Sequence, residues 1–134
     1  MKKRTSTTCP VVFTVDILGD NWTLVILRDL LLNGKSHFRE FLASDEKIAS
    51  NILSNRLEGM IAAGLITKQA DERNKSAAIY RPTQKTLDLL PMLFELIKWG
   101  VKYNPNIDLS DPGLQLLLRD QDTLHRQVLA QFET

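Results

Sequence analysis

Two helices joined by a short polar turn constrain the fold most, because two strands follow them directly in the sequence. Ser36 can cap a short helix over about 37–43. After the polar turn a longer helix runs over about 50–63, and Gly64 ends it in the left-handed conformation. The sequence therefore predicts a helix-turn-helix over about 36–64.

A hairpin is expected immediately after the longer helix. Residues 65–70 and 77–81 show the partial apolar alternation of strands, and the charged stretch 71–76 between them forms the turn. Pro82 ends the second strand because it cannot donate to a strand ladder. A helix-turn-helix followed by such a wing, here 65–82, is the outline of a winged helix.

Further helices flank this segment on both sides, so the fold class is mainly α with a small β-hairpin wing. Apolar residues at helical spacing predict helices over 10–18 and 22–32 before it. After it, a long helix over 84–103 contains Pro91, which should kink the helix unless it restarts there. A last amphipathic helix is expected over 112–132.

The length of 134 residues predicts a single winged-helix domain over 1–134. With 43% hydrophobic and 25% charged residues, the composition is that of an ordinary globular protein. The basic start of the chain continues into polar residues, and no apolar run is long enough to cross a membrane, so we expect a cytoplasmic protein. The single cysteine, Cys9, excludes an internal disulfide and a cysteine-cluster metal site.

The helix over 50–63 carries two faces of different chemistry. Its apolar stripe, expected to be buried, consists of Leu53, Leu57, Met60 and Ile61. The opposite stripe carries mostly short hydrogen-bonding side chains, namely Asn51, Ser54, Asn55 and Glu58. Such side chains can reach base edges in the major groove, where Asn can pair with adenine through both of its polar atoms. Most surface helices have a polar face, so the stripe alone gives modest support for DNA binding.

Further candidates for DNA contacts surround this helix. Ser50 lies at its N-terminus, where backbone N–H groups favour phosphate. Arg56 lies off the polar stripe and can contact the DNA backbone or form an internal ion pair. The candidates on the flanking elements are His37 and Arg39 on the preceding helix, and Arg73, Asn74 and Lys75 on the hairpin turn. The net charge is only +1, but residues 1–103 are net basic and residues 104–134 net acidic, as expected if the basic part meets DNA.

Several short motifs occur together in one order. They are Cys9-Pro10-Val11, Leu18-Gly19-Asp20-Asn21-Trp22, Phe38-Arg39-Glu40-Phe41, Ile52-Leu53-Ser54-Asn55-Arg56-Leu57, Ala63-Gly64-Leu65-Ile66 and Leu89-Leu90-Pro91. Over about residues 9–100 the chain resembles the HxlR-type family of bacterial winged-helix regulators, relatives of the MarR-type proteins. The shared order makes this resemblance more specific than one isolated helix-turn-helix.

The resemblance implies a homodimeric, sequence-specific transcription regulator, and we expect a repressor. The N-terminal helix and the C-terminal helices, about 84–133, would join the protomers. Each protomer would then place a recognition helix in one half of a near-palindromic double-stranded operator. Two positions depart from the family pattern: His37 stands where many members have Arg, and 81–86 lacks the Thr-Pro-x-Gly often found before the long helix.

Cys9 suggests one way in which binding could be gated. In some members of this family an N-terminal Cys-Pro cysteine senses electrophiles or oxidants. Cys9 would lie at a helix N-terminus, where the dipole favours the thiolate, with the basic residues 2–4 nearby. The alternative is a small, partly buried residue at a helix start with no such role. A small-molecule effector also stays open, since Trp22 and Trp99, expected in the core, could line a pocket.

An enzyme is not expected, and neither is a cofactor or a metal site. His37 and His125 lie far apart in the sequence, and neither belongs to a nucleophile or metal pattern. The remaining alternative is a winged helix that serves only as a protein-interaction module, which the near-neutral net charge leaves open.

Overall fold

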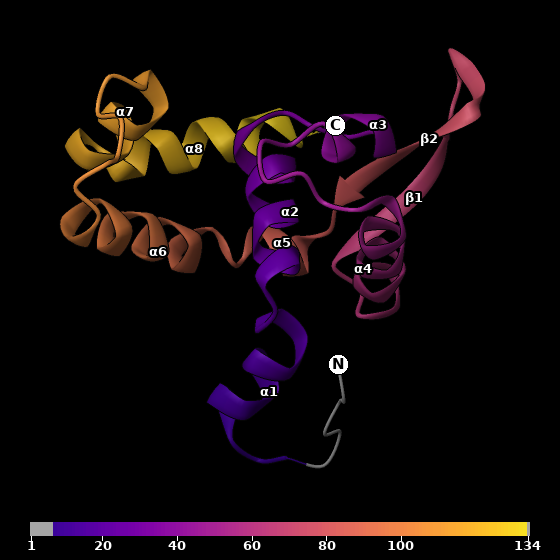
Figure 1. The fold of residues 1–134 in the computed structure, drawn as a ribbon, viewed down its shortest axis with the longest axis horizontal. Helices are drawn as coiled ribbons and strands as arrows, with labels where there is room; N and C mark the ends of the chain where they lie inside the picture. Colours follow the sequence, from indigo (N-terminus) through magenta and orange to yellow (C-terminus); the bar gives the residue numbers. More distant parts are fainter. Residues whose placement is uncertain (1–6, 134) are drawn as a thin grey trace. The chain divides into compact units, whose positions relative to one another are not determined.

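The computed structural model describes residues 7–133 of the chain. Its backbone contacts divide the chain into two compact units, Met1–Thr83 and Gln84–Thr134. The first unit contains four helices and a hairpin in its described part, and the second contains four helices in its described part (Figure 1). The single domain over 1–134 that the length suggests stays a prediction.

The first unit begins with two helices whose ends follow the sequence signals. Helix α1 spans Pro10–Leu18 with its proline in the first turn, where the missing N–H costs nothing. Helix α2 spans Asn21–Leu32, and the Asp20 carboxylate caps it by accepting from the backbone N–H groups of Trp22 and Thr23.

Helix α3 spans Phe38–Leu42, and its N-cap is His37 rather than Ser36, so the sequence prediction was wrong here by one residue. The reason is Glu40, whose carboxylate accepts from the backbone N–H groups of both Ser36 and His37 at 3.0 Å. Helix α4 spans Ser50–Ala62, and Gly64 follows at φ +75°, which confirms the expected left-handed stop.

The hairpin is longer than its apolar residues suggest. Strand β1 spans Ile66–Asp71 and β2 spans Asn74–Pro82, in antiparallel register with an irregularity after Ala70. The prediction of a turn over 71–76 was therefore wrong, because the ladder continues almost to Glu72 and Arg73. Most side chains at the outer end of the hairpin are exposed, so the backbone pairs there without the apolar alternation that marks a strand in sequence.

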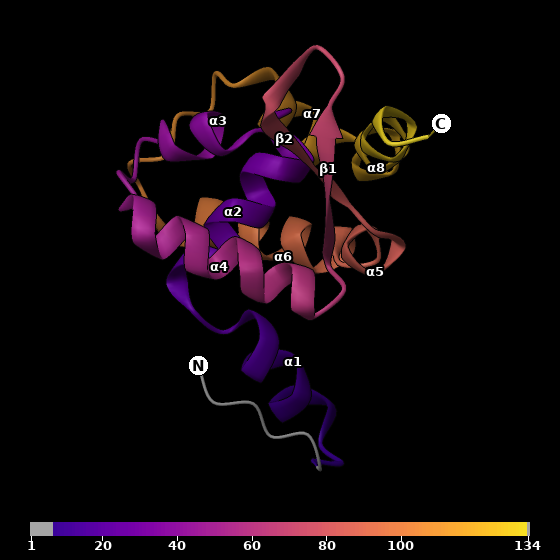
Figure 2. The ribbon, with the colours of Figure 1, turned by 90° about the vertical axis from the view of Figure 1, so that its right-hand side faces the viewer.

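The core of the first unit lies under α4. The stripe residues Leu53, Leu57 and Met60 are buried as expected, and α4 lies against α2, α3 and β1 (Figure 2). Ile61 is 37% exposed, so its prediction as a buried residue was wrong. It borders an open groove between α4 and the hairpin instead of the core.

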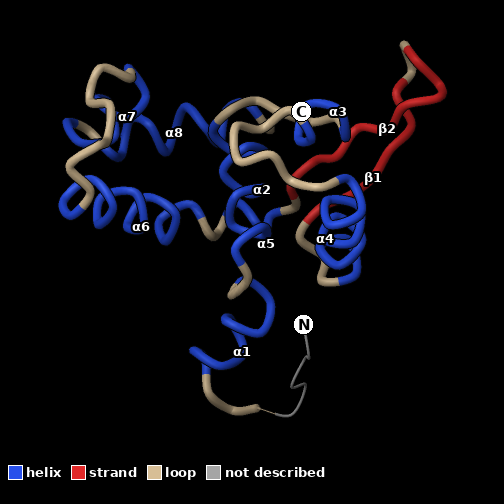
Figure 3. Tube along the Cα trace, viewed as in Figure 1, coloured by secondary structure: helices blue, strands red, loops and turns tan. Residues whose placement is uncertain are grey.

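The second unit also departs from the sequence prediction. The long helix expected over 84–103 is split into α5, Gln84–Leu87, and α6, Leu90–Tyr103, which restarts with Pro91 in its first turn (Figure 3). The last helix expected over 112–132 is also two helices, α7, Pro112–Arg119, and α8, Gln121–Gln131. Asp120 breaks it, since its carboxylate accepts from the Thr123 N–H and so caps α8.

The buried side chains of the second unit include Leu93 and Phe94 of α6, and the Phe94 ring meets the His125 ring edge-on at 5.9 Å. Trp99 is 68% exposed, so its prediction as a core residue was wrong, while Trp22 in the first unit is half-buried. In residues 7–133 no single helix has both the length and the hydropathy to cross a membrane. Helices α1 and α2 meet these criteria only as a pair bent by 79°.

The different burial of two α4 side chains predicts different costs of truncation. Leu53→Ala should lower the free energy of unfolding by about 2–5 kcal/mol, because a fully buried leucine leaves a cavity. Ile61→Ala, the matched control on the same helix, should cost less than about 1 kcal/mol. Urea denaturation with an unchanged m-value measures both. Equal costs for the two variants would contradict the assigned face of α4.

Candidate nucleic-acid interface

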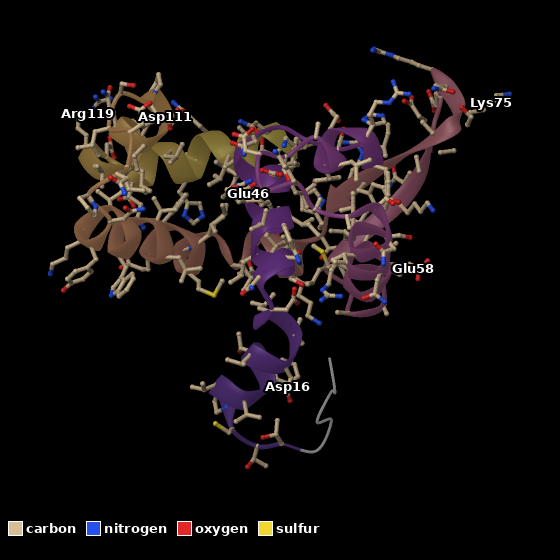
Figure 4. The ribbon with its side chains drawn as sticks, in the orientation of Figure 1. Asp16, Glu46, Glu58, Lys75, Asp111 and Arg119 are labelled. Carbon is tan, nitrogen blue, oxygen red and sulfur yellow. The ribbon has the colours of Figure 1, made fainter. Side chains whose placement is uncertain are left out.

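The outer face of α4 carries the polar stripe expected from the sequence. Asn51, Ser54, Asn55 and Glu58 are all exposed, as is Ser50 at the start of the helix. Glu58 extends outward from α4 in Figure 4. Within residues 7–133 the side chains of Asn51 and Ser54 make no hydrogen bond, so their polar atoms are available to a ligand.

The N-terminus of α4 adds donors beside this stripe. Its N-cap is Ala49, and no side chain among the described residues caps the first turn. The backbone N–H groups of that turn therefore lack intrahelical partners, and such groups at the positive end of a helix dipole favour an anion. Ser50 and Asn51 lie in this turn, so the group expected to bind phosphate and the group expected to read bases lie close together.

A groove of about 1140 Å³ lies between α4, α3 and the hairpin. From α4 it is lined by Ser54, Glu58 and Ile61, while α3 supplies Arg39 and the hairpin supplies Lys75, among others. Lys75 lies near the tip of the hairpin, which projects from the body of the first unit (Figure 4). The groove thus brings five of the sequence candidates into one surface, namely His37, Arg39, Ser54, Asn74 and Lys75.

Three of the candidate cations are open to a ligand. Arg39, Arg73 and Lys75 are exposed, and none of them makes a side-chain ion pair within residues 7–133. Asn74 is already engaged, because its Oδ1 accepts from the backbone N–H and the hydroxyl of Ser76. The Asn74 side chain, which lies near the tip of the hairpin, therefore stabilises the backbone there.

His37 is held between two carboxylates rather than free for phosphate. Its Nε2 lies 3.0 Å from Oδ2 of Asp71, and its Nδ1 lies 3.1 Å from Oε1 of Glu40. The hydrogen bond with Asp71, and then that with Glu40, raise the pKa of His37. The ring therefore ties the start of α3 to the end of β1.

Arg56 forms the internal ion pair that the sequence left as one of two alternatives. Its Nε donates to Oδ1 of Asp20 at 3.0 Å, and its Nη1 donates to Oδ1 of Asn55 at 2.7 Å. Burial raises the pKa of Asp20, but hydrogen bonds from Thr23, Arg56 and Trp22 outweigh it and leave the pKa lowered. The candidates Asn55 and Arg56 are thus in direct contact.

A second cluster fixes the turn that leads into α4. Arg28 donates through both Nη atoms to the carboxylate of Glu46, at 2.9 and 2.8 Å, and also to the buried carboxylate of Asp29. Asp29 further accepts from Asn33 and Lys35. The Arg28 hydrogen bonds hold the pKa of Glu46 down at about 2. This network joins the C-terminal half of α2 to the turn before α4.

Sequence reasoning missed two residues at this interface. Lys68 lines the groove, and its Nζ lies 5.9 Å from the centre of the Tyr80 ring across the hairpin. Asp20, which occurs in one of the shared motifs, caps α2 and also binds Arg56. Strand register and the packing of two helices decide these contacts, and neither can be read from spacing along the chain.

Cys9 is exposed and occupies the N-cap position of α1, where its backbone N–H donates to Oγ1 of Thr7. The basic residues 2–4, expected near it, lie outside the described residues. Within residues 7–133 no group of His, Cys, Asp and Glu side chains could hold a metal ion.

A short helix, a turn, a longer helix and a two-stranded hairpin define the first unit as a winged helix-turn-helix. The family model described as HxlR-like helix-turn-helix matches residues 17–108, and the chain belongs to this family.

Curated relatives and solved structures agree with this assignment. The uncharacterized HTH-type transcriptional regulator YdeP of Bacillus subtilis is 31% identical over 100 residues, which cover 75% of this chain and 77% of YdeP. The structure of PA1607 is similar with a TM-score of 0.70 and 33% identity, covering 77% of this chain and 72% of that one. The oxidized form of the redox regulator HypR has a TM-score of 0.63 and 25% identity, over 75% and 100% of the two chains.

The pKa shifts of His37 and Asp71 predict how the hairpin responds to pH. The pKa of His37 is raised above 6.5, so the contribution of His37 protonation to the contact is fully present below pH 6.5 and is lost as the pH rises through the raised pKa. The pKa of Asp71 is lowered from 3.8, so acid also weakens the contact as the pH falls through that lowered pKa.

Hydrogen exchange at the Tyr80 N–H, which donates to the Ser36 carbonyl at 2.7 Å, measures this contact once corrected for intrinsic exchange rates. Protection should fall as the pH rises in the wild type, and Asp71→Asn should flatten the profile. Asp108→Asn, which removes a carboxylate from the second unit, is the control. A wild-type profile that is already flat would contradict the role of His37.

Proposed function

We propose that the protein is a homodimeric transcription regulator that binds double-stranded DNA in a sequence-specific manner and acts by binding rather than by catalysis. The observation that carries the proposal is the outer face of α4, where exposed Asn and Ser side chains follow an uncapped helix N-terminus. A helix that reads the major groove needs short polar side chains at its N-terminal end and a rigid apolar back.

The candidate residues divide by the chemistry of their contacts. Asn51, Ser54 and Asn55 are proposed to meet base edges, since amide and hydroxyl groups match the donor and acceptor pattern of the major groove. Ser50 and the first-turn N–H groups would bind phosphate. The cations Arg39, Arg73 and Lys75 would bind phosphate or enter the minor groove, and His37 could join them only by leaving its carboxylate partners.

Exposed apolar side chains on two helices support a homodimer. On α1, Val11, Phe13 and Val15 are 68%, 52% and 51% exposed. On α6, Trp99 and Tyr103 are 68% and 60% exposed, and their ring centres lie 5.0 Å apart with the ring planes tilted by 48°. Apolar surface of this kind marks a protein interface. A two-fold dimer would match a near-palindromic operator, and occupancy of such an operator in the cytoplasm would repress a nearby promoter.

The two kinds of DNA contact predict different mutant behaviour. Asn51→Ala should cost roughly 1–3 kcal/mol of operator binding with little change on unrelated DNA, because a base contact is lost. Lys75→Ala should weaken binding to all duplexes alike, because a phosphate contact does not depend on sequence. Gel-shift titration of both variants on operator and scrambled duplexes measures this. Operator binding like the wild type by both Asn51→Ala and Asn55→Ala would remove α4 as the reading helix.

The remaining alternative is a winged helix that binds only proteins. Lys and Arg contacts to phosphate release counterions, so the logarithm of the DNA association constant should fall linearly with the logarithm of the salt concentration. Steep salt dependence on duplex DNA supports the regulator. Absence of binding even at low salt would favour the protein-interaction module.

Cys9 is proposed to gate binding through oxidation or an electrophile. Its exposure at the start of α1 supports this, as does the similarity to HypR, which is described as a redox regulator. Diamide should lower the operator affinity of the wild type but not that of Cys9→Ser. Because Cys9 is the single cysteine, every thiol reaction of the chain is assigned to it. Equal loss of affinity in both proteins would rule out gating by Cys9, and a small-molecule effector would remain.

A further inference from the structure

A chain of three side chains connects the start of α2 to the outer face of α4. Asn55 accepts from Arg56 through Oδ1, and Arg56 in turn donates through Nε to Asp20. The guanidinium is planar and holds its N–H groups in a fixed fork. Arg56 contacts Asp20 and Asn55 through two different nitrogens of this plane, so the orientation of the guanidinium is fixed. The position of the Asn55 carbonyl oxygen is thereby fixed as well.

The inner end of this chain is anchored more firmly than a surface ion pair. Oδ1 of Asp20 also accepts from the backbone N–H groups of Trp22 and Thr23, both at 2.9 Å, and Oδ2 accepts from the Thr23 hydroxyl. The Asp20 side chain is 18% exposed and that of Arg56 33% exposed. Asp20 is therefore fixed to the backbone of α2 and cannot follow Arg56 if the latter moves.

Packing alone does not hold Arg56 in place. Asp20, Thr23, Asn55 and Arg56 line an open pocket of about 370 Å³, which residues of α1 and of the second half of α4 also line. Open space beside the guanidinium leaves room for other rotamers. The hydrogen bonds from Arg56 to Asp20 and Asn55 are what select the observed one.

The contact has a chemical consequence for Asn55. A carboxamide presents an acceptor at one end and two donors at the other. Pairing with adenine needs both ends of the amide at one base edge. The contact with Arg56 occupies one of the two lone pairs of the Asn55 oxygen and turns that oxygen toward Arg56. The amide N–H groups remain, and these suit the acceptors of guanine, N7 and O6, or O4 of thymine. Asn51 makes no side-chain hydrogen bond within residues 7–133, so both its amide oxygen and its amide N–H groups are available to pair with adenine.

We propose that Asp20 is a positioning residue for base reading: through Arg56 it orients the Asn55 amide so that Asn55 selects guanine or thymine rather than adenine at one operator position. Asp20 itself touches no DNA. The inference rests on the proposed DNA-binding function, and it adds a determinant of specificity that lies behind the reading helix.

Asp20→Asn is the informative variant, because Asn is as good a helix N-cap as Asp but lacks the charge that holds Arg56. Asp45→Asn is the matched control, since it removes one exposed carboxylate from the turn before α4 and so reproduces any general electrostatic gain. Arg56→Lys is a second variant that keeps the positive charge and loses the fork.

The experiment selects bound duplexes from a pool with a randomised core, using the purified full-length chain and each variant. Asn55→Ala first identifies the position that Asn55 reads, as the one whose base preference disappears. At that position the wild type should favour guanine or thymine over adenine by about tenfold, the size of a good base contact. Asp20→Asn and Arg56→Lys should reduce this preference to within about threefold and leave the other positions unchanged.

The double variant Asp20→Asn/Asn55→Ala should show the same preferences as Asn55→Ala alone, because both changes act through one amide. Asp45→Asn should strengthen binding to all duplexes without altering any preference. The inference is overturned if Asp20→Asn changes all positions equally, if the wild type favours adenine at the Asn55 position, or if Asp20→Asn leaves the preference intact.

A measurement without DNA separates this inference from the proposed function. In the free protein, Asp20→Asn should shift the NMR signals of Arg56 Nε–H and of the Asn55 side-chain amide, and Asp45→Asn should shift neither. If the wild type selects no duplex from the pool, the proposed function fails and this inference falls with it, even when the free-protein shifts appear. If it selects duplexes and the shifts are absent, only the positioning role fails.

Discussion

Two ion pairs connect α2 to α4 and to the turn before it, and the rest of the first unit depends on them. The residue at the α2 side is acidic in one pair and basic in the other. At its start, Asp20 binds Arg56 on α4 itself. Toward its end, Arg28 binds Glu46 in the turn before α4. Between these points Leu53 and Leu57 are buried. Ion pairs add little net stability, so we expect their main effect to be the selection of one placement of α4 among those that the apolar contacts would allow.

The hairpin is attached to this frame through α3. The His37 ring meets Asp71, the Ser36 carbonyl accepts from the Tyr80 N–H, and the Phe41 and Tyr80 rings make an edge contact at 6.2 Å. The wing is therefore a fixed extension of the helix-turn-helix rather than a separate arm. Its exposed cations keep a defined place relative to the outer face of α4, so one protein surface can contact a groove and the neighbouring phosphates together.

Periodicity and caps predicted the order of elements, the two faces of α4 and the stop at Gly64, because these depend on neighbours in the chain. Other features depend on partners that are distant in sequence. The strands of the hairpin extend beyond its apolar residues. The last predicted helix is divided at Asp120, which caps α8. Ile61 and Trp99 are exposed rather than buried. For the candidate site, the sequence predicted the polar residue types and the helix that carries them. It did not predict that Arg56 pairs with Asp20 or that His37 pairs with Asp71.

The outer face of α4 and the hairpin tip are the surfaces proposed to meet DNA. The most direct measurement is the shift of backbone amide NMR signals when an operator duplex, selected by the protein itself, is titrated into it. We expect the largest shifts in the first two turns of α4 and at Arg73–Lys75, with small shifts in α6. Shifts concentrated on α6 or α8, with α4 unaffected, would contradict the account.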